Sequence, residues 1–587
     1  MKNMARLGAP PSATGEGIVR NYNSSKVIQL HKLTRPGLPT RNIAPRHCTI
    51  VKAKADHDNA DFETSSPRLL FQRCAAAATA VTISLQAGFA PMALAVATLD
   101  SSNINNTITI SSQTTIAPLI VKPDVLDTLP PLPKDFPPLP PLKLPKMDRI
   151  TLKNGLRVIL LEDREAPLVR GTLFMRGGQR ASPQNKTGLA SIAAAVQRSG
   201  GSMQHPGSSL DNEVEELAAA IEGGAGSDSV SMGFSCLAED APYLLKLFTE
   251  VITSPAIPQS KLDLFKAQAL NSLEHKNDNA GGIPAREVSK LIYGKDSPYA
   301  REPTITQVSS ITPDDAKNWL ATWERPDTAV LGLVGDFDPI DMAKLVEDTL
   351  GTWTPAAGVG SPKPQVEAPP LPSQEKIQGK IYLVDRPGSS QASIVMAEPG
   401  IQMMDPDEVE LDVLAGVLNS FGGRLFDEIR SKAGLAYSVS GGWASVPPDH
   451  PGLFLATAET AQPAQLLSAL RKALTVAATT APTFQEVDRA REESLNSFIF
   501  GFASTGAQLR RSVAFELLGI PQDYPFTYRN KLTKVTADDI QEAAVRHLHP
   551  EKMVTVVVGD AKIIKPQIEK MLGISVDMLK LENDTGV

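Results

Sequence analysis

Cysteine is scarce in this chain, which has three cysteines among 587 residues. Two of them, Cys48 and Cys74, fall in N-terminal segments that we expect to be removed. One remaining thiol, Cys236, provides neither a disulfide framework nor a cysteine metal site. We therefore interpret Cys236 as a small core residue.

Acidic residues are almost absent from the N-terminal region. Up to Lys54 the chain has ten Lys or Arg residues and one acid, Glu16, whereas the whole chain carries a net charge of −7. The remainder is therefore acidic, which argues against a nucleic-acid partner. A basic, acid-poor stretch rich in Ser, Asn and Pro is typical of a transit peptide, and we assign residues 1–54 to one.

A second targeting segment, residues 55–97, contains the uncharged run Cys74–Ala97. A basic leader followed by such a run and a small-x-small site at Ala93-Leu94-Ala95 resembles the bipartite signal of thylakoid-lumen proteins. The run is also about long enough to span a bilayer as an uncleaved anchor. We expect cleavage, because Pro91 and polar residues interrupt it. The expected location is the chloroplast, in the thylakoid lumen or associated with its membrane, and the alternative is the mitochondrion.

The rest of the chain contains one unit twice. Ile311-Thr312-Pro313-Asp314-Asp315 matches Val535-Thr536-Ala537-Asp538-Asp539, and Val334-Gly335-Asp336 matches Val558-Gly559-Asp560, at a shift of about 224 residues. The opening strands Val158–Leu161 and Ile381–Val384 follow the same shift, which predicts a duplicated domain of about 200 residues. The predicted order is a Ser/Asn- and Pro-rich linker at 98–146, a first domain at 147–353, a Pro-rich linker at 354–376, a second domain at 377–575 and a tail at 576–587.

Each copy mixes strands with long helical stretches. We predict helices at Asp240–Ile252, Lys261–Lys276 and Thr483–Phe498, with a Thr N-cap before each acidic first turn of the repeat. Alternating strands such as VSMGFSCL and LFLATAET predict a sheet with one face against helices. The fold class is therefore α+β, as two duplicated α/β sandwich domains facing each other across a cleft.

The segment Phe421–Trp443 combines a Gly-Gly turn, an amphipathic helix, a glycine stop at Gly434 and a predicted strand. Arg430 lies near the helix end and Tyr437 lies seven residues later, within that strand. A cation beside a phenolic donor can bind a peptide carbonyl or a developing oxyanion. From spacing alone, a surface Arg and a half-buried strand Tyr explain the same pattern.

Taken together, the strand, the GLA helix, the YG…SPY…R turn, the VGD strand and LFDEIRSKAGLAYSV resemble the pitrilysin/insulinase family of zinc peptidases, which includes the mitochondrial processing peptidase subunits. The resemblance covers residues 147–575. It implies two domains of the processing-peptidase type. Members carry an inverted zinc motif, His-x-x-Glu-His, on the helix that begins with Gly-Leu-Ala, with a third ligand on a later helix.

In this chain the positions implied to bind zinc are degenerate. Ser191 stands at the first His, Ala194 at the Glu and Ala195 at the second His, and Ser272 stands at the third ligand, near Glu274. None of these side chains serves as a zinc ligand or a general base. The only close histidine pair, His547 and His549, fits a solvated or capping role better than a metal site. We expect no metal and no cofactor bound by this chain.

The other half of the family's site is kept. The resemblance implies that Arg430 and Tyr437 steady the substrate carbonyl and the tetrahedral intermediate. It also implies that the strand Gly226–Phe234 receives the substrate as an added β-strand.

We therefore expect a zinc-less, non-catalytic subunit of a heterodimeric metallopeptidase. A zinc-bearing pitrilysin-type paralogue would be its partner, would carry the Zn, and would cleave peptides or presequences with the help of Arg430 and Tyr437. The chain alone is expected to be inactive. The alternative is a catalytically inactive scaffold or peptide-binding protein of the same fold.

Overall fold

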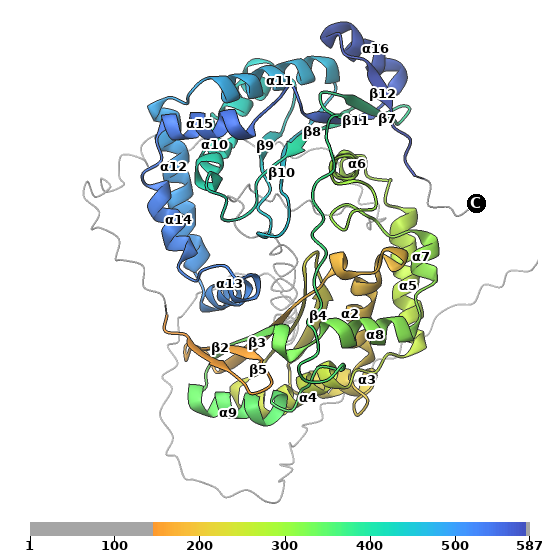
Figure 1. Cartoon of the computed structure of the whole chain (residues 1–587), viewed down its shortest axis with the longest axis vertical. Helices are drawn as coiled ribbons and strands as arrows, with labels where there is room; N and C mark the ends of the chain where they lie inside the picture. The colour runs from red at the N-terminus through yellow and green to blue at the C-terminus, as the bar shows by residue number, and fades with distance from the viewer. Residues whose placement is uncertain (1–144, 583–587) are drawn as a thin grey trace, which may run out of the picture. The chain divides into compact units, whose positions relative to one another are not determined.

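The computed structural model describes residues 145–582, and the two predicted targeting segments, the linker up to residue 144 and the last five residues lie outside this range. The described chain forms two six-stranded sheets with helices packed against them (Figure 1). We call residues 147–353 the first half and residues 377–575 the second half. Among the described residues, none of the helices has both the length and the apolar character that a membrane span requires.

The strands of the two sheets have the following bounds, in chain order. The first sheet contains β1 (Asp148–Thr151), β2 (Arg157–Glu162), β3 (Leu168–Arg176), β4 (Ala220–Ala225), β5 (Ser229–Leu237) and β6 (Ala329–Gly335). The second sheet contains β7 (Ile381–Asp385), β8 (Ala392–Pro399), β9 (Val439–Trp443), β10 (Leu453–Thr460), β11 (Val554–Gly559) and β12 (Val576–Met578).

The helices follow the same duplicated pattern. The first half contains α2 (Leu189–Gly200), α3 (Ser208–Glu216), α4 (Ala241–Thr253), α5 (Gln259–Glu274), α6 (Gly282–Tyr293), α7 (Ile305–Ser309), α8 (Pro313–Trp323) and α9 (Pro339–Leu350). The second half contains α10 (Glu408–Asn419), the π-helix η6 (Phe426–Lys432), α11 (Pro463–Thr479), α12 (Phe484–Phe498), α13 (Thr505–Leu518), α14 (Tyr524–Leu532), α15 (Ala537–His547) and α16 (Ala561–Leu572).

The two sheets share one strand order, as the repeat predicts. The first runs β1-β2-β6-β3-β5-β4 and the second runs β12-β7-β11-β8-β10-β9. In each sheet the strand ending in Val-Gly-Asp lies parallel to the opening strand and antiparallel to the next one. The sheets differ at one edge, where β1 pairs antiparallel with β2 while β12 pairs parallel with β7. The α+β class with two sheets is confirmed.

Both faces of the first sheet are covered. In β2, Val158 and Leu160 belong to the core shared with helices of the first half. Ile159, between them, points to the opposite face and packs with Val513 of α13, which comes from the second half. Gly332 of β6 permits this close approach, because a Cβ there would lie 2.5 Å from Cγ2 of Val513. Figure 1 shows α13 lying beside β2 and β3.

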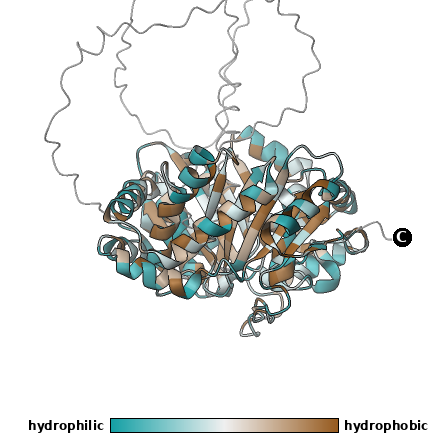
Figure 2. Cartoon of the chain, turned by 90° about the horizontal axis from the view of Figure 1, so that it is seen from above, coloured by the Kyte–Doolittle hydropathy of each residue, from teal (hydrophilic) through white to brown (hydrophobic). Residues whose placement is uncertain are grey.

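The second sheet is covered in the reciprocal way. Val395 of β8 and Val556 of β11 pack with Val288 and Ile292 of α6, a helix of the first half. Helices α6 and α13 occupy equivalent places in the repeat, so the halves exchange the same element. Because helices cover both faces of each sheet, the strands are largely hydrophobic, while the helices carry hydrophilic outer faces (Figure 2).

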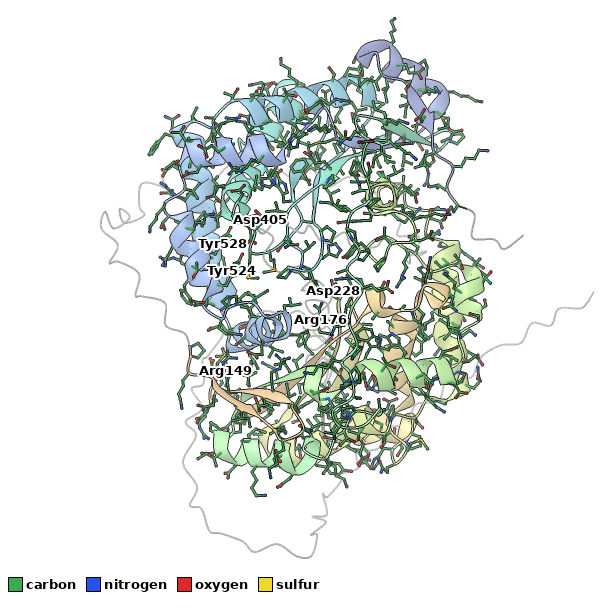
Figure 3. The ribbon with its side chains drawn as sticks, viewed as in Figure 1. Arg149, Arg176, Asp228, Asp405, Tyr524 and Tyr528 are labelled. Carbon is green, nitrogen blue, oxygen red and sulfur yellow. The ribbon has the colours of Figure 1, made fainter. Side chains whose placement is uncertain are left out.

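A polar contact also joins the halves. Arg180, which is buried, forms ion pairs with Asp228 of its own half and with Asp449 of the second half (3.5 Å to the latter). Arg176 binds the other oxygen of Asp449. Figure 3 labels Arg176 and Asp228. Tyr299 stacks on Arg180 at 4.8 Å from the ring centroid.

Several local predictions are confirmed. The helices expected around Asp240–Ile252, Lys261–Lys276 and Thr483–Phe498 are α4, α5 and α12. Thr312 and Thr536 each close a capping box, accepting a hydrogen bond from the backbone N–H three residues on. Cys236 is a buried free thiol, and burial raises its pKa to about 12.

Candidate functional site

The segment that carries Arg430 begins where α10 ends. Gly422 has φ +80°, in the left-handed region, and makes the turn from α10 into η6. Leu425 and Ile429 are fully buried beneath η6, as their spacing predicts. The chain leaves η6 through Gly434, which has φ +60°. The predicted amphipathic helix is thus present, but as a π-helix, a wider form that recurs at functional sites.

Arg430 and Tyr437 are brought together. The Arg430 guanidinium carbon lies 4.6 Å from the Tyr437 ring centroid and 4.9 Å from the Phe426 ring centroid. Phe421 packs on Phe426 with ring centroids 4.9 Å apart. The guanidinium therefore contacts two rings, in cation–π contacts that orient it. We call these four residues the aromatic clamp.

The clamp faces solvent, and its polar ends are available. Tyr437 is 83% exposed and Phe421 is 87% exposed. Within residues 145–582, the Arg430 guanidinium and the Tyr437 hydroxyl form no hydrogen bond or ion pair. The prediction that Tyr437 lies in a strand is wrong, because β9 begins at Val439. Gly434 ends the helix three residues before Tyr437, and the chain is irregular between them.

Two side chains that the sequence did not point to hold this region in place. Asn419, the last residue of α10, donates from its amide to the Gly441 carbonyl and accepts from the Gly441 N–H, both at 2.8 Å. Thr460 of β10 donates to the carbonyl of Leu435 at 2.6 Å. The clamp is thereby tied to α10 and to the second sheet. No periodic pattern marks Asn419, although Phe421 and Phe426 could have been found as aromatics near Arg430.

The positions that the resemblance matches to zinc ligands lie on two packed helices of the first half, α2 and α5. Ala194 is buried in the core, whereas Ser191 and Ala195 are half-buried. Ser272 is exposed on α5, and its hydroxyl donates to the carbonyl of Gln268 at 3.0 Å. Two methyl groups and two hydroxyls do not fit a Zn²⁺ ion, which takes imidazole, thiolate or carboxylate ligands.

The substrate strand expected at Gly226–Phe234 is wrongly placed. That stretch becomes β5, which pairs with β3 on one side and β4 on the other, so it has no free edge. The edge strands of this sheet are β1, which pairs with β2 alone, and β4, which pairs with β5 alone. Strand order is a long-range property, which is why the sequence did not reveal this. A peptide strand added to this sheet would have to pair with β1 or with β4, the neighbour of β5.

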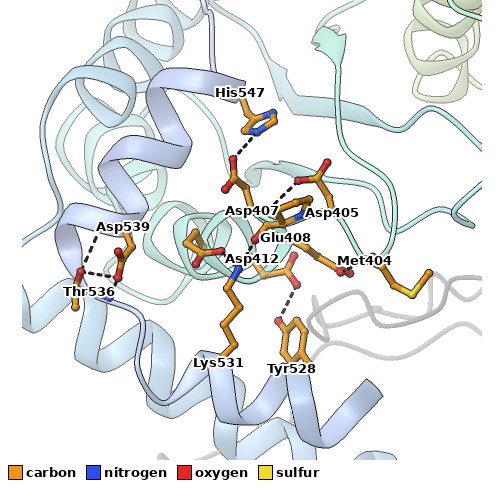
Figure 4. Close-up of polar contacts among 12 residues, drawn as sticks. Met404, Asp405, Asp407, Glu408, Asp412, Tyr528, Lys531, Thr536, Asp539 and His547 are labelled. Carbon is orange, nitrogen blue, oxygen red and sulfur yellow. Dashed lines mark hydrogen bonds and ion pairs between the residues drawn. The ribbon is translucent and has the colours of Figure 1, made fainter. Parts of the chain in front are cut away.

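The histidine pair does not act as a unit. His547 hydrogen-bonds Asp407 through Nε2 at 2.8 Å, whereas His549 hydrogen-bonds Glu398 through Nδ1 at 3.1 Å. Asp405, Asp407 and His547 form the one cluster in the described chain whose ligand atoms lie close enough for a metal (Figure 4).

A counter-charge already occupies that cluster. The guanidinium of Arg546 donates to both oxygens of Asp407, at 2.8 and 2.9 Å. These hydrogen bonds are the main cause that lowers the pKa of Asp407. We interpret the cluster as an ion-pair network that attaches α15 to the loop before α10.

Buried carboxyl groups also connect α10 to α14. Tyr528 donates to Asp412 at 2.7 Å, and Tyr524 donates to Glu408 one turn earlier (Figure 4 shows the former). Burial raises the pKa of Asp412 to about 7. These hydrogen bonds hold α10, the helix that directly precedes the clamp, against α14.

Comparison with known proteins agrees with this architecture. The family described as "Peptidase M16 inactive domain" matches residues 310–494. This range contains the clamp but none of the four positions matched to zinc ligands. An uncharacterized zinc protease of Streptomyces coelicolor is 24% identical over 68% of this chain and 86% of its own length. The uncharacterized zinc protease YmxG of Bacillus subtilis is 22% identical over 63% of this chain and 88% of its own.

A solved structure shows the same fold. The M16 inactive domain protein of Pseudomonas fluorescens superposes with a TM-score of 0.62 at 24% identity, covering 74% of this chain and all of that protein. Its fold, the family match and the two relatives agree with one another. The chain is a homologue of the pitrilysin/insulinase family of zinc peptidases.

Proposed function

We propose that this chain is the zinc-less, non-catalytic subunit of a heterodimeric pitrilysin-type metallopeptidase. The observation that carries the proposal is the clamp. Arg430 and Tyr437 are in contact, exposed and without polar partners among the described residues. The same chain offers no zinc ligand at Ser191, Ala194, Ala195 or Ser272. We infer that this chain supplies one half of a peptidase site and that a partner supplies the other.

The geometry suits stabilisation of an oxyanion. The Arg430 guanidinium lies against the rings of Phe426 and Tyr437, and its N–H groups have no hydrogen-bond partner among the described residues, so they remain for a ligand. The Tyr437 hydroxyl adds a second donor from the adjacent ring. Fixed donors aimed at a developing negative charge stabilise a transition state without reorganising. The zinc ion and the general base would be supplied by the partner chain.

A peptide substrate can bind at an edge strand of the first half. The outer side of β4 lacks a strand neighbour, and Gly223 and Gly224 remove side chains from part of that edge. An extended peptide can pair there through its backbone, in the manner of β-augmentation. We propose β4, and not β5, as the substrate-binding strand.

The test uses the chain reconstituted with its zinc-bearing partner. A native pull-down followed by mass spectrometry identifies that partner as a stoichiometric relative containing His-x-x-Glu-His. Turnover of a peptide is then measured with Arg430→Ala and Tyr437→Phe. Removing one oxyanion donor should lower kcat roughly 100-fold. Lys472→Ala, which removes an exposed lysine of α11 that forms no ion pair within residues 145–582, is the control and should leave kcat unchanged.

An inactive scaffold or peptide-binding protein is the second candidate. The loss of every zinc-ligand position favours it as strongly as it favours the split site. The two differ in their need for Arg430 and Tyr437, which a scaffold does not use. If the pull-down recovers only this chain or a large membrane complex, or if both variants leave turnover intact, the scaffold is the better account.

For location, we propose the chloroplast, in the thylakoid lumen or at its membrane. The proposal is supported only by the basic segment 1–54 and the run Cys74–Ala97. Import of the full chain into isolated chloroplasts, followed by fractionation, tests it. Import into mitochondria instead would contradict it.

A further inference from the structure

The aromatic clamp leaves a positive charge uncompensated. η6 carries two carboxylates close to Arg430, but Glu428 forms its ion pair with Lys432 at 2.5 Å, and no bond joins Asp427 to Arg430. A guanidinium beside two carboxylates usually forms an ion pair with one of them. Here the guanidinium contacts the rings of Phe426 and Tyr437 instead.

The shape of the free donor edge selects the ligand. The guanidinium is planar and presents its N–H groups in a fixed fork, so a hydrogen-bonding ligand approaches in the plane of those groups. A carboxylate matches this edge with two parallel hydrogen bonds, and the charged pair is about twice as strong as a bond to a neutral carbonyl. The exposed rings of Phe421 and Tyr437 beside it provide apolar area for a neighbouring side chain.

We propose that the clamp binds a peptide carboxylate that is adjacent to an apolar residue, with Arg430 as the carboxylate-binding residue and Phe421 and Tyr437 as the apolar wall. The carboxylate comes either from the C-terminus of a peptide or from an Asp or Glu side chain. The proposal deepens the proposed function, and rests on it only in placing a peptide at Arg430.

Binding to the full chain alone is measured by fluorescence anisotropy with three labelled decapeptides. The first ends in Phe with a free carboxylate, the second is its C-terminal amide, and the third is amidated but contains an internal Glu-Phe pair. We expect the free-acid peptide, the Glu-Phe peptide or both to bind at least roughly tenfold more tightly than the plain amide. Which of the two does so identifies the source of the carboxylate.

Variants then assign the selectivity to the clamp. Arg430→Gln should reduce binding of the carboxylate peptide to the level of the amide, and Phe421→Ala should weaken all three peptides. Lys472→Gln removes one positive charge from an exposed site on α11 that forms no ion pair within residues 145–582, and it should leave the selectivity intact, while circular dichroism confirms folding of each variant. Equal binding of all three peptides, or equal effects of Arg430→Gln and Lys472→Gln, would overturn the proposal.

The outcome is separable from that of the proposed function. Loss of turnover in Arg430→Ala without any carboxylate selectivity keeps the split-site peptidase and overturns this inference. Carboxylate selectivity that depends on Arg430, with turnover of the pair unaffected, keeps this inference and contradicts the peptidase role.

Discussion

The substitution Glu324→Gln tests how a buried carboxyl group sets the pH dependence of stability. Glu324 follows α8, is 5% exposed, and accepts a hydrogen bond from Gln197 of α2 at 2.6 Å. Its other oxygen is buried without a hydrogen-bond partner among residues 145–582. Burial raises the pKa of Glu324 from 4.5 to about 8.

The direction in which the free energy of unfolding changes with pH depends on whether the folded or the unfolded chain holds the proton. Between pH 4.5 and 8 the folded protein keeps Glu324 protonated while the unfolded chain releases the proton, so the free energy of unfolding falls as pH rises. The slope is about 1.4 kcal/mol per pH unit, and the loss reaches about 4 kcal/mol at pH 8. Gln has nearly the same shape, accepts the same bond and does not ionise. Relative to the parent, the variant should therefore gain about 3 kcal/mol between pH 5.5 and pH 8.

Urea unfolding followed by tryptophan fluorescence measures this gain, because Trp319 and Trp323 lie on the helix that precedes Glu324. Glu375→Gln, at an exposed linker carboxyl, serves as the control and should show a pH-independent difference. The reasoning is refuted if the difference between Glu324→Gln and the parent is the same at both pH values.

Two further predictions concern the packing of α13 on the first sheet and the support of the clamp. Gly332→Ala should destabilise the protein by about 1–3 kcal/mol, because its Cβ would lie 2.5 Å from Val513, and Val513→Ala should recover part of the loss. Gly224→Ala, whose Cβ meets nothing within 4 Å, is the control, and equal melting temperatures of the two glycine variants would contradict the exchange of α13. Asn419→Ala removes both bonds to Gly441 and should cost about 1–3 kcal/mol and speed amide exchange at Gly441. Unchanged exchange there would show that Asn419 does not support the clamp.

Local features of this fold could be predicted from the sequence because neighbouring residues determine them. Thr312 and Thr536 cap helices through residues three positions on, and the repeated Val-Gly-Asp strands mark equivalent elements of both halves. The repeat itself predicted that the two sheets would be alike. Their shared strand order follows from it.

The features that the sequence did not reveal depend on distant parts of the chain. The exchange of α6 and α13 joins residues that are far apart in the chain, such as Ile159 and Val513, and the edge position of β4 depends on the order of the whole sheet. At the site, the pairing of Arg430 with Tyr437 was predicted and is present, but the exposure of Tyr437 before β9 was not. That exposure reflects the turn at Gly434, which delays the strand.

The central claim is that this chain completes a peptidase whose zinc lies in another subunit. The most direct test measures peptide turnover by the zinc-bearing partner alone, with the parent chain, and with the Arg430→Ala chain at equal occupancy of the complex. The account predicts turnover with the parent chain, roughly 100-fold less with Arg430→Ala, and comparably little with the partner alone. Full turnover by the partner alone, or by the complex containing Arg430→Ala, would contradict it.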